Sequence, residues 1–225
     1  MQQELESKIV SLQRIEEPSK FLIFVQGSWE VGDNERNVAA SKGIEEKGLA
    51  STLLYESSRD WGALQRASTR EEWIKSFRDK SYQDELAELN ALIRYVNAQY
   101  QPQEIFLSGS SFGAGLVALN LDTATNITRV LLSCPQIHLN DDAERISIYR
   151  RFPDTECFLR VISRFRGRLH IIHGDLDNMV LLEQSFALYN AATTPHKRLV
   201  ILPGDHSFSG TNKENYVKEH LIAFR

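Results

Sequence analysis

Short apolar runs alternate along the chain with stretches in which apolar residues recur at helical spacing. Apolar runs typical of buried strands cover residues 21–25, 49–55, 104–108, 129–133, 168–172 and 197–202. Stretches typical of helices cover residues 34–47, 83–100, 114–120, 156–165, 181–191 and 215–224. This alternation predicts an α/β fold, with a mostly parallel sheet covered by helices on both faces. Residues 8–15 fit an additional, antiparallel edge strand.

Two further features of the pattern bear on the organisation of the chain. The stretch between the second strand and the longest helix is polar, contains Trp61, Gly62 and Trp73, and is expected to form a loop. With 225 residues and no internal repeat, the chain is expected to form a single domain that covers residues 1–225.

The composition is that of an ordinary globular protein and disfavours several classes of partner. The formal net charge of −4 gives no reason to expect binding to nucleic acid or to an anionic membrane. The longest apolar runs are too short to span a membrane, and the polar residues 1–8 do not resemble a secretion signal. The two cysteines, Cys134 and Cys157, fit a reducing compartment. We therefore expect a cytoplasmic protein with no membrane partner.

The segment Gly109–Gly113 has the pattern Gly-x-Ser-x-Gly and lies between a predicted strand and a predicted helix. This context is typical of a nucleophile elbow, a sharp turn that exposes a serine at the start of a helix. Glycines two residues before and after the serine leave room where the strand and the helix cross. The helix N-terminus offers N–H groups to a developing negative charge. We predict that Ser111 is a nucleophile; the alternative is a glycine-rich turn with a surface serine.

Further candidate residues follow later strands, at the end where ligands bind in sheets of this kind. Asp175 and Asp177 follow the strand at 168–172, and His206 follows the last strand. Of the six histidines, His206 is the one that follows the last strand end, from which the fold can bring it to Ser111 as a base.

A metal cluster of His170, His173, Asp175 and Asp177 is a competing interpretation of the same region. It is disfavoured because residues three apart on a strand point to opposite faces of the sheet, so His170 and His173 should not converge.

The order Ser, Asp, His along the chain, with each residue after a strand, resembles that of the α/β-hydrolases. Gly174–Asp177 is similar to the acid loop of that family, and Asp205-His206 to its histidine loop. The resemblance implies that Ser111 is the nucleophile, His206 the base, and Asp177 rather than Asp175 the acid that orients the histidine. A triad of this kind needs no metal and no cofactor.

Residues 26–29, Gln-Gly-Ser-Trp, stand where the α/β-hydrolases have their first oxyanion loop, with glutamine in the place of the usual histidine. The N–H of Phe112 is expected to bind the oxyanion because Phe112 follows the nucleophile. The second donor is expected to be the N–H of Ser28 or of Trp29.

The interval 135–167 is too short for a separate cap domain and is expected to form a small helical lid over an accessible pocket. This lid is rich in arginine, at positions 145, 150, 151, 160, 164, 166 and 168. The arginines could attract an anionic substrate, or they could form a solvated helix face balanced by nearby carboxylates; the second interpretation is favoured.

These features predict a serine hydrolase that cleaves an ester, thioester or similar acyl bond of a small-molecule substrate. The alternatives are acyl transfer or cofactor-free lyase chemistry with the same triad, and a non-catalytic binding module on the same fold. The sequence leaves the substrate and the oligomeric state open.

Overall fold

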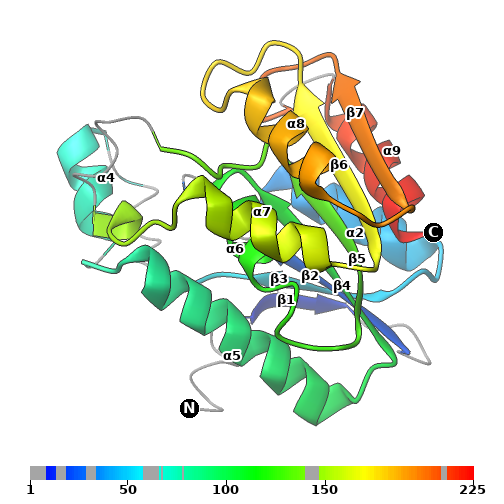
Figure 1. Cartoon of the computed structure of the whole chain (residues 1–225). Helices are drawn as coiled ribbons and strands as arrows, with labels where there is room; N and C mark the ends of the chain where they lie inside the picture. Colours follow the sequence, from blue (N-terminus) through cyan, green and yellow to red (C-terminus); the bar gives the residue numbers. More distant parts are fainter. Residues whose placement is uncertain are drawn as a thin grey trace.

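In the part of the chain that the structure describes, seven strands form one sheet, in the order β1-β3-β2-β4-β5-β6-β7 (Figure 1). The computed structural model describes residues 9–13, 19–28, 34–57, 66, 68–77, 79–139, 147–208 and 212–225. The strands are β1 (Ile9–Gln13), β2 (Lys20–Val25), β3 (Ser51–Tyr55), β4 (Glu104–Ser110), β5 (Ile127–Ser133), β6 (Arg168–Gly174) and β7 (Lys197–Leu202). β1 pairs with β3 in the antiparallel direction, and every other pairing is parallel. The predicted α/β fold and its antiparallel edge strand are confirmed.

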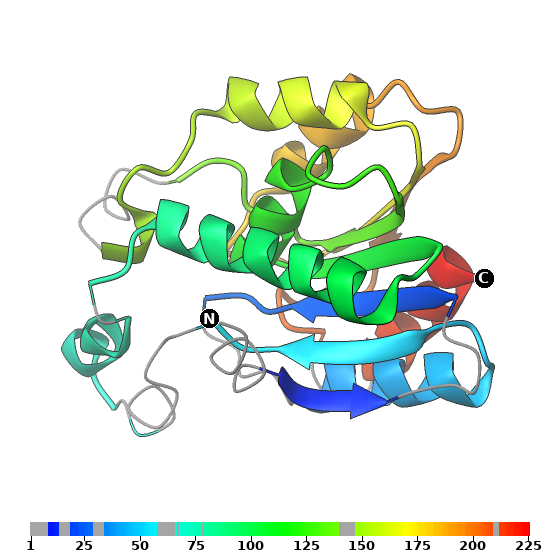
Figure 2. The same cartoon turned by 90° about the horizontal axis from the view of Figure 1, so that it is seen from below.

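Helices cover both faces of the sheet. The helices are α2 (Glu35–Glu46), α4 (Arg70–Ser76), α5 (Tyr82–Tyr100), α6 (Phe112–Leu119), α7 (Thr155–Arg164), α8 (Leu182–Ala191), α9 (Lys213–Phe224) and the short 3-10 helix η2 (Ser147–Tyr149). Helices α5, α6, α7 and α8 lie on one face, and α2 and α9 lie together on the other (Figure 2). Each face has its own apolar cluster against the central strands, whose side chains are nearly all buried.

The expectation of a loop between the second strand and the long helix is wrong for residues 70–76, which form α4. Thr69 and Glu72 make a capping box at the start of this helix: the Thr69 hydroxyl accepts from the Glu72 N–H, and the Glu72 carboxylate accepts from the Thr69 N–H. The spacing Thr-x-x-Glu is a known signal of a helix start, and it could have been used here. Trp61 and Gly62 lie outside the described residues, as does part of the lid, at 140–146.

The carboxyl ends of the parallel strands β2 to β7 lie along one edge of the sheet. Helix α5 directly precedes β4 in the chain and runs in the opposite direction to it. The first residues of α5 therefore lie at the same end of the sheet as the carboxyl end of β4. Figure 2 shows α4 and the start of α5 beyond the arrowheads of β2 and β3. The predicted site residues that the structure describes follow strand ends, so they are placed along this edge. No helix in the described part of the chain is long and apolar enough to cross a bilayer.

Candidate active site

Ser111 lies in a strained turn between β4 and α6. Its backbone has φ 53° and ψ −119°, a conformation that side chains other than glycine rarely adopt. The turn is held by backbone bonds to the neighbouring strand and to the lid: the Ser111 N–H donates to Ser133 O (2.8 Å), and Ser111 O accepts from the Gln136 N–H (3.2 Å). Strain of this size persists only where the surroundings fix it, which is typical of a functional turn.

The two glycines of the motif are required by close backbone contacts. A Cβ atom added to Gly113 would lie 2.3 Å from Gln26 O, at the end of β2. A Cβ atom added to Gly109 would lie 2.6 Å from Ala114 Cα, in the helix that follows the turn. The sequence argument for small residues on both sides of Ser111 therefore holds in atomic detail.

Asp177 and His206 form a hydrogen-bonded pair at the same edge of the sheet. His206 Nδ1 lies 2.7 Å from Asp177 Oδ2, and the other oxygen of Asp177 accepts from the N–H groups of Met179 (2.9 Å) and Val180 (3.0 Å). The Asp177 side chain is fully buried, and that of His206 is 12% exposed. Burial raises the pKa of Asp177, but the bonds from His206, Val180 and Met179 outweigh it and lower the pKa to about 2. Asp177 is therefore ionised at neutral pH and holds the imidazole by one nitrogen.

Asp175 has a different partner, although it lies only two residues from Asp177. Its Oδ1 accepts from the Gly204 N–H (2.9 Å), in the loop that carries His206. Asp175 therefore braces the loop that carries His206. The two loops touch closely, since a Cβ atom added to Gly174 would lie 2.5 Å from Gly204 O.

His173 contacts the loop that carries Asp177 and supports it, a role that the sequence pattern did not indicate. It is fully buried, with Nδ1 2.7 Å from Ser185 Oγ, Nε2 3.0 Å from Val180 O, and Nε2 3.4 Å from Asp177 Oδ2. Burial lowers its pKa, so it is neutral and donates from Nε2 to the loop. A histidine four residues before the acid is the only sequence signal for this role.

The other buried histidines of β6 and α9 belong to the opposite face of the sheet. His170 lies 2.9 Å from Glu219 on α9, whereas His173 contacts α8, so the two side chains point to opposite faces, as expected. His220 Nε2 lies 2.8 Å from Ser108 Oγ. Burial lowers the pKa of His170 to about 4 and that of His220 to about 3. Neither is placed to act at the edge that carries Ser111.

Arg36, at the start of α2, joins the serine turn to the histidine loop. Its Nη2 donates to Ser110 Oγ (2.6 Å) and its Nη1 to Ser207 O (2.5 Å). The guanidinium also lies 5.0 Å from the ring centroid of Tyr216, and the residue is 6% exposed. Ser110 precedes Ser111 and Ser207 follows His206, so one buried cation ties the neighbours of both predicted catalytic residues.

Ser28 is buried beside the elbow, in the loop expected to supply an oxyanion donor. Its Oγ lies 3.1 Å from the hydroxyl of Tyr149, the last residue of η2, and the Tyr149 ring packs edge-on against Phe112. Phe112 opens α6, and the first N–H groups of a helix have no acceptor within it. Trp29 lies outside the described residues, so the choice between Ser28 and Trp29 stays open.

Cys134 lies next to the acid and the histidine, at the end of β5. A ligand atom of each of Cys134, Asp177 and His206 lies within 4.8 Å of the others, the one such group among the described residues. Burial, followed by the charge of Asp177, raises the pKa of the Cys134 thiol, so it is protonated. Asp177 and His206 are already bonded to each other. A protonated thiol and an occupied pair are poor ligands for a resident metal.

The structure therefore brings the residues predicted for the triad to one edge of the sheet. Within the described residues no hydrogen bond joins Ser111 Oγ to His206, and such bonds are often long in unliganded hydrolases. The turn that carries Ser111 and the loop that carries His206 are nevertheless adjacent, because Arg36 bonds to both Ser110 and Ser207. Cys134 follows Ser133, whose carbonyl accepts from the Ser111 N–H, and its sulfur lies within 4.8 Å of a ring nitrogen of His206.

Comparisons with solved structures define the fold. Est1E from Butyrivibrio proteoclasticus shares 16% sequence identity with the chain, has a TM-score of 0.70, and the match covers 94% of this chain and 90% of that one. A structure of the metagenome-derived lipolytic enzymes LipS and LipT shares 14% sequence identity with a TM-score of 0.70, and the match covers 96% of this chain and 97% of that one. The dienelactone hydrolase from Anabaena variabilis shares 15% sequence identity with a TM-score of 0.67, and the match covers 95% of this chain and 91% of that one. No protein-family profile matches the chain, and no curated protein does. The chain has the α/β-hydrolase fold, as its resemblance implied.

Proposed function

We propose that this protein is a serine hydrolase that cleaves a carboxylic ester, a thioester or a similar acyl bond. The observation that carries the proposal is the Asp177–His206 pair, held at 2.7 Å on the sheet edge that also presents the strained Ser111. An ionised, buried carboxylate bonded to one imidazole nitrogen leaves the other nitrogen to act as a base. Solved structures of the same fold include proteins described as lipolytic enzymes and a dienelactone hydrolase, which agrees with this class of reaction.

The proposed reaction proceeds through an acyl-enzyme. His206 Nε2 takes the proton of the Ser111 hydroxyl as Oγ attacks the substrate carbonyl, and the N–H groups of Phe112 and of Ser28 or Trp29 hold the oxyanion. The imidazolium then gives its proton to the leaving oxygen or sulfur. A water molecule, deprotonated by His206, releases the acyl group and restores Ser111. No step requires a metal or a cofactor.

The lid sets the expected substrate size. In the described residues it consists of η2 and α7, with no inserted domain between β5 and β6. We expect a small-molecule substrate with a short or medium acyl group, because so small a lid encloses little apolar surface. Highest activity on long-chain esters, with activation at a lipid interface, would contradict this expectation.

A fluorophosphonate probe followed by ester turnover tests the proposal. The wild-type protein should be labelled at Ser111 and should hydrolyse p-nitrophenyl esters, and Ser111→Ala should lose both properties while keeping its melting temperature. Ser163→Ala, on α7, is the control and should be labelled as the wild type is. Labelling at Ser108 or Ser110 instead would refute the assignment of Ser111. If the protein turned over an ester without forming an acyl-enzyme, the lyase alternative would be favoured.

A further inference from the structure

A polar hollow with a volume of about 760 Å³ lies between the start of α5 and the end of η2. It is lined by Ser81, Asp84, Tyr149, Arg150, Arg151 and Phe152. The loop that carries the arginines is fixed to α5 through its backbone carbonyls: Arg150 O accepts from the Tyr82 N–H (3.2 Å), and Arg151 O accepts from the Gln83 side chain (3.3 Å). The wall of the hollow that bears the positive charge is therefore held in place before any ligand binds.

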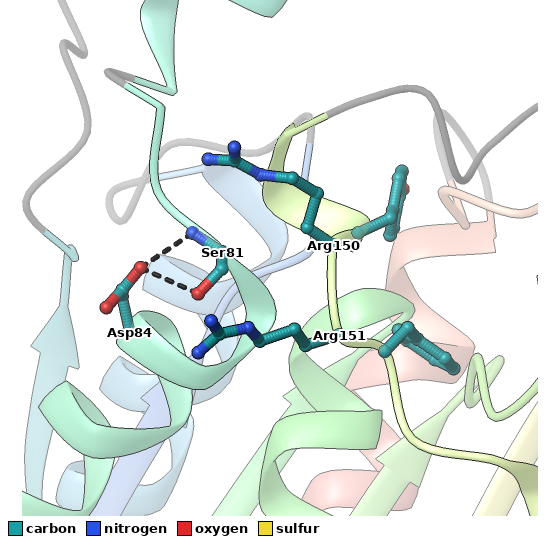
Figure 3. A pocket seen from close by; sticks show the side chains of 6 residues that line it. Ser81, Asp84, Arg150 and Arg151 are labelled. Carbon is teal, nitrogen blue, oxygen red and sulfur yellow. Dashed lines mark hydrogen bonds between the residues drawn. The ribbon is translucent and has the colours of Figure 1, made fainter.

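Both arginine side chains extend toward the start of α5, one on each side of Ser81 (Figure 3). Arg150 Nη2 donates to Asp79 O (2.5 Å). The Arg151 guanidinium has no hydrogen bond or ion pair within the described part of the chain, although Asp84 lines the same hollow. The Asp84 carboxylate is bonded to the N–H (2.8 Å) and hydroxyl (2.7 Å) of Ser81, which lower its pKa. The acid is thus committed to capping the helix, and the guanidinium of Arg151 is left for a ligand.

Arg160, Arg164 and Arg166, the other arginines of the described part of the lid, differ from this pair. Arg160 contacts Cys157 on its own helix, and Arg166 donates to Ser163 O (3.1 Å). Arg164 and Arg166 line a separate hollow, together with Thr128 of β5. These side chains fit the solvated helix face expected from the sequence. Arg150 and Arg151 differ because their hollow is also lined by Tyr149, which contacts Ser28 and Phe112.

Tyr149 connects the hollow to the proposed catalytic site. It lines the hollow, its hydroxyl lies 3.1 Å from Ser28 Oγ, and its ring packs against Phe112 at a centroid distance of 5.7 Å. Both contacts are with residues proposed to bind the oxyanion. Tyr149 therefore contacts both the hollow and the residues proposed to bind the oxyanion.

We propose that this hollow binds a carboxylate at the far end of the acyl group, so that the preferred substrates are monoesters or thioesters of dicarboxylic acids. The inference rests on the proposed hydrolase function and specifies its substrate class. Two arginines and one aspartate give the lining a single net positive charge, which matches one carboxylate better than a phosphate dianion. The planar guanidinium groups bind carboxylates through paired N–H donors.

A matched pair of substrates tests the proposal: p-nitrophenyl hemiadipate and p-nitrophenyl hexanoate, which have equal chain lengths and differ in the terminal carboxylate. The wild-type protein should have the higher kcat/KM for the hemiadipate, and added NaCl should reduce this preference. Arg150→Gln and Arg151→Gln should each lower kcat/KM for the hemiadipate by about tenfold and leave that for the hexanoate unchanged. Arg151→Lys should retain part of the preference because it keeps the charge.

The controls separate this proposal from the hydrolase function. Arg164→Gln, at the other hollow, should leave both esters unaffected, and melting temperatures verify that each variant is folded. A wild type with no preference for the hemiadipate, or arginine variants that lose activity on both esters equally, would overturn the carboxylate site. Inhibition by inorganic phosphate but not by adipate would also overturn it. If the wild-type protein hydrolysed neither ester, the hydrolase function itself would fail, and if Ser111→Ala still hydrolysed the hexanoate, the role of Ser111 as nucleophile would fail.

Discussion

Arg36 donates a hydrogen bond of 2.6 Å to the hydroxyl of Ser110, the residue before the proposed nucleophile. The same guanidinium reaches Ser207 O, one residue after the proposed base. Arg36 thus acts on the site through its neighbours, as a positioning residue, and not through the substrate.

Arg36→Lys should reduce kcat by about 10- to 100-fold, because a lysine cannot reach both loops with one planar group, and small misplacements of catalytic groups are costly. KM should change little. Arg36→Met should also lower stability, by about 3 kcal/mol, since two hydrogen bonds to a buried cation are lost. Stopped-flow labelling by the fluorophosphonate measures the reactivity of Ser111 directly. Unchanged labelling in a folded Arg36→Lys protein would show that the contact is only structural.

Replacement of each acid separates the roles of Asp177 and Asp175. Asp177→Asn should lower kcat by orders of magnitude, since the loss of the acid in a serine protease costs about 10⁴-fold. Asp175→Asn should keep most of the activity and lower stability by about 1 kcal/mol, because its bond to Gly204 braces a loop. Ester turnover and melting temperature of both variants decide the matter. An inactive Asp175→Asn beside an active Asp177→Asn would transfer the role of the acid.

The stability contributed by Asp177 should depend on pH in a defined direction. Its pKa is about 2 in the folded protein, compared with 3.8 for an unperturbed aspartate, so the unfolded chain binds the proton more readily. The contribution, about 1–2 kcal/mol when solvent screening is allowed for, should be present in full above about pH 4 and disappear as the pH falls toward 2. Unfolding of the wild type and of Asp177→Asn, compared between pH 6 and pH 2.5, measures it. A stability difference that did not shrink on acidification would contradict the low pKa.

Two glycine-to-alanine variants should have opposite effects on stability. Gly113→Ala places a Cβ atom 2.3 Å from a backbone oxygen of β2, so the elbow must shift, with a loss of several kcal/mol and of activity. Gly43→Ala, in the middle of α2, meets only side-chain carbons at 3.6 Å or more and should stabilise the protein by about 0.5–1 kcal/mol. Thermal melts compare the two. Equal tolerance at both positions would mean that the elbow is looser than the structure describes.

A chelator should leave the activity unchanged, because the proposed reaction uses only groups of the chain. The one group of possible ligands in the described residues includes the buried, protonated thiol of Cys134. Cys134→Ala should therefore retain ester turnover with and without EDTA. Activity that disappears with EDTA and returns with zinc would refute a metal-free mechanism.

Much of the architecture could be predicted from the sequence because period and position carry it. The strand at 197–202 was predicted with the bounds that the structure has, and even the weak edge strand at 9–13 was found. Helix α4 was missed because its seven residues are too few to show a hydrophobic period, and its capping box was overlooked. The single-domain organisation over residues 1–225 stays a prediction.

The site could be predicted only where residue type and strand ends coincide. The resemblance to the acid loop of the α/β-hydrolases predicts Asp177 rather than Asp175, and Asp177 is the one bonded to His206. Arg36, His173 and Tyr149 could not be found in this way, because each acts through a contact with a residue more than 100 positions away or through burial. Such contacts depend on how α2 and η2 pack against the rest of the protein and on what covers each face of β6, which the local pattern does not encode.

The close contact between the ends of β6 and β7 has a consequence for anyone who redesigns this protein. Gly174 lies against Gly204 O without room for a Cβ atom, and Asp175 is bonded to the Gly204 N–H. The segments that carry the proposed acid, Asp177, and the proposed base, His206, should therefore be exchanged as one unit. A graft from another hydrolase should include both segments together, because a new acid loop would meet an old histidine loop that neither fits its backbone nor receives its hydrogen bond.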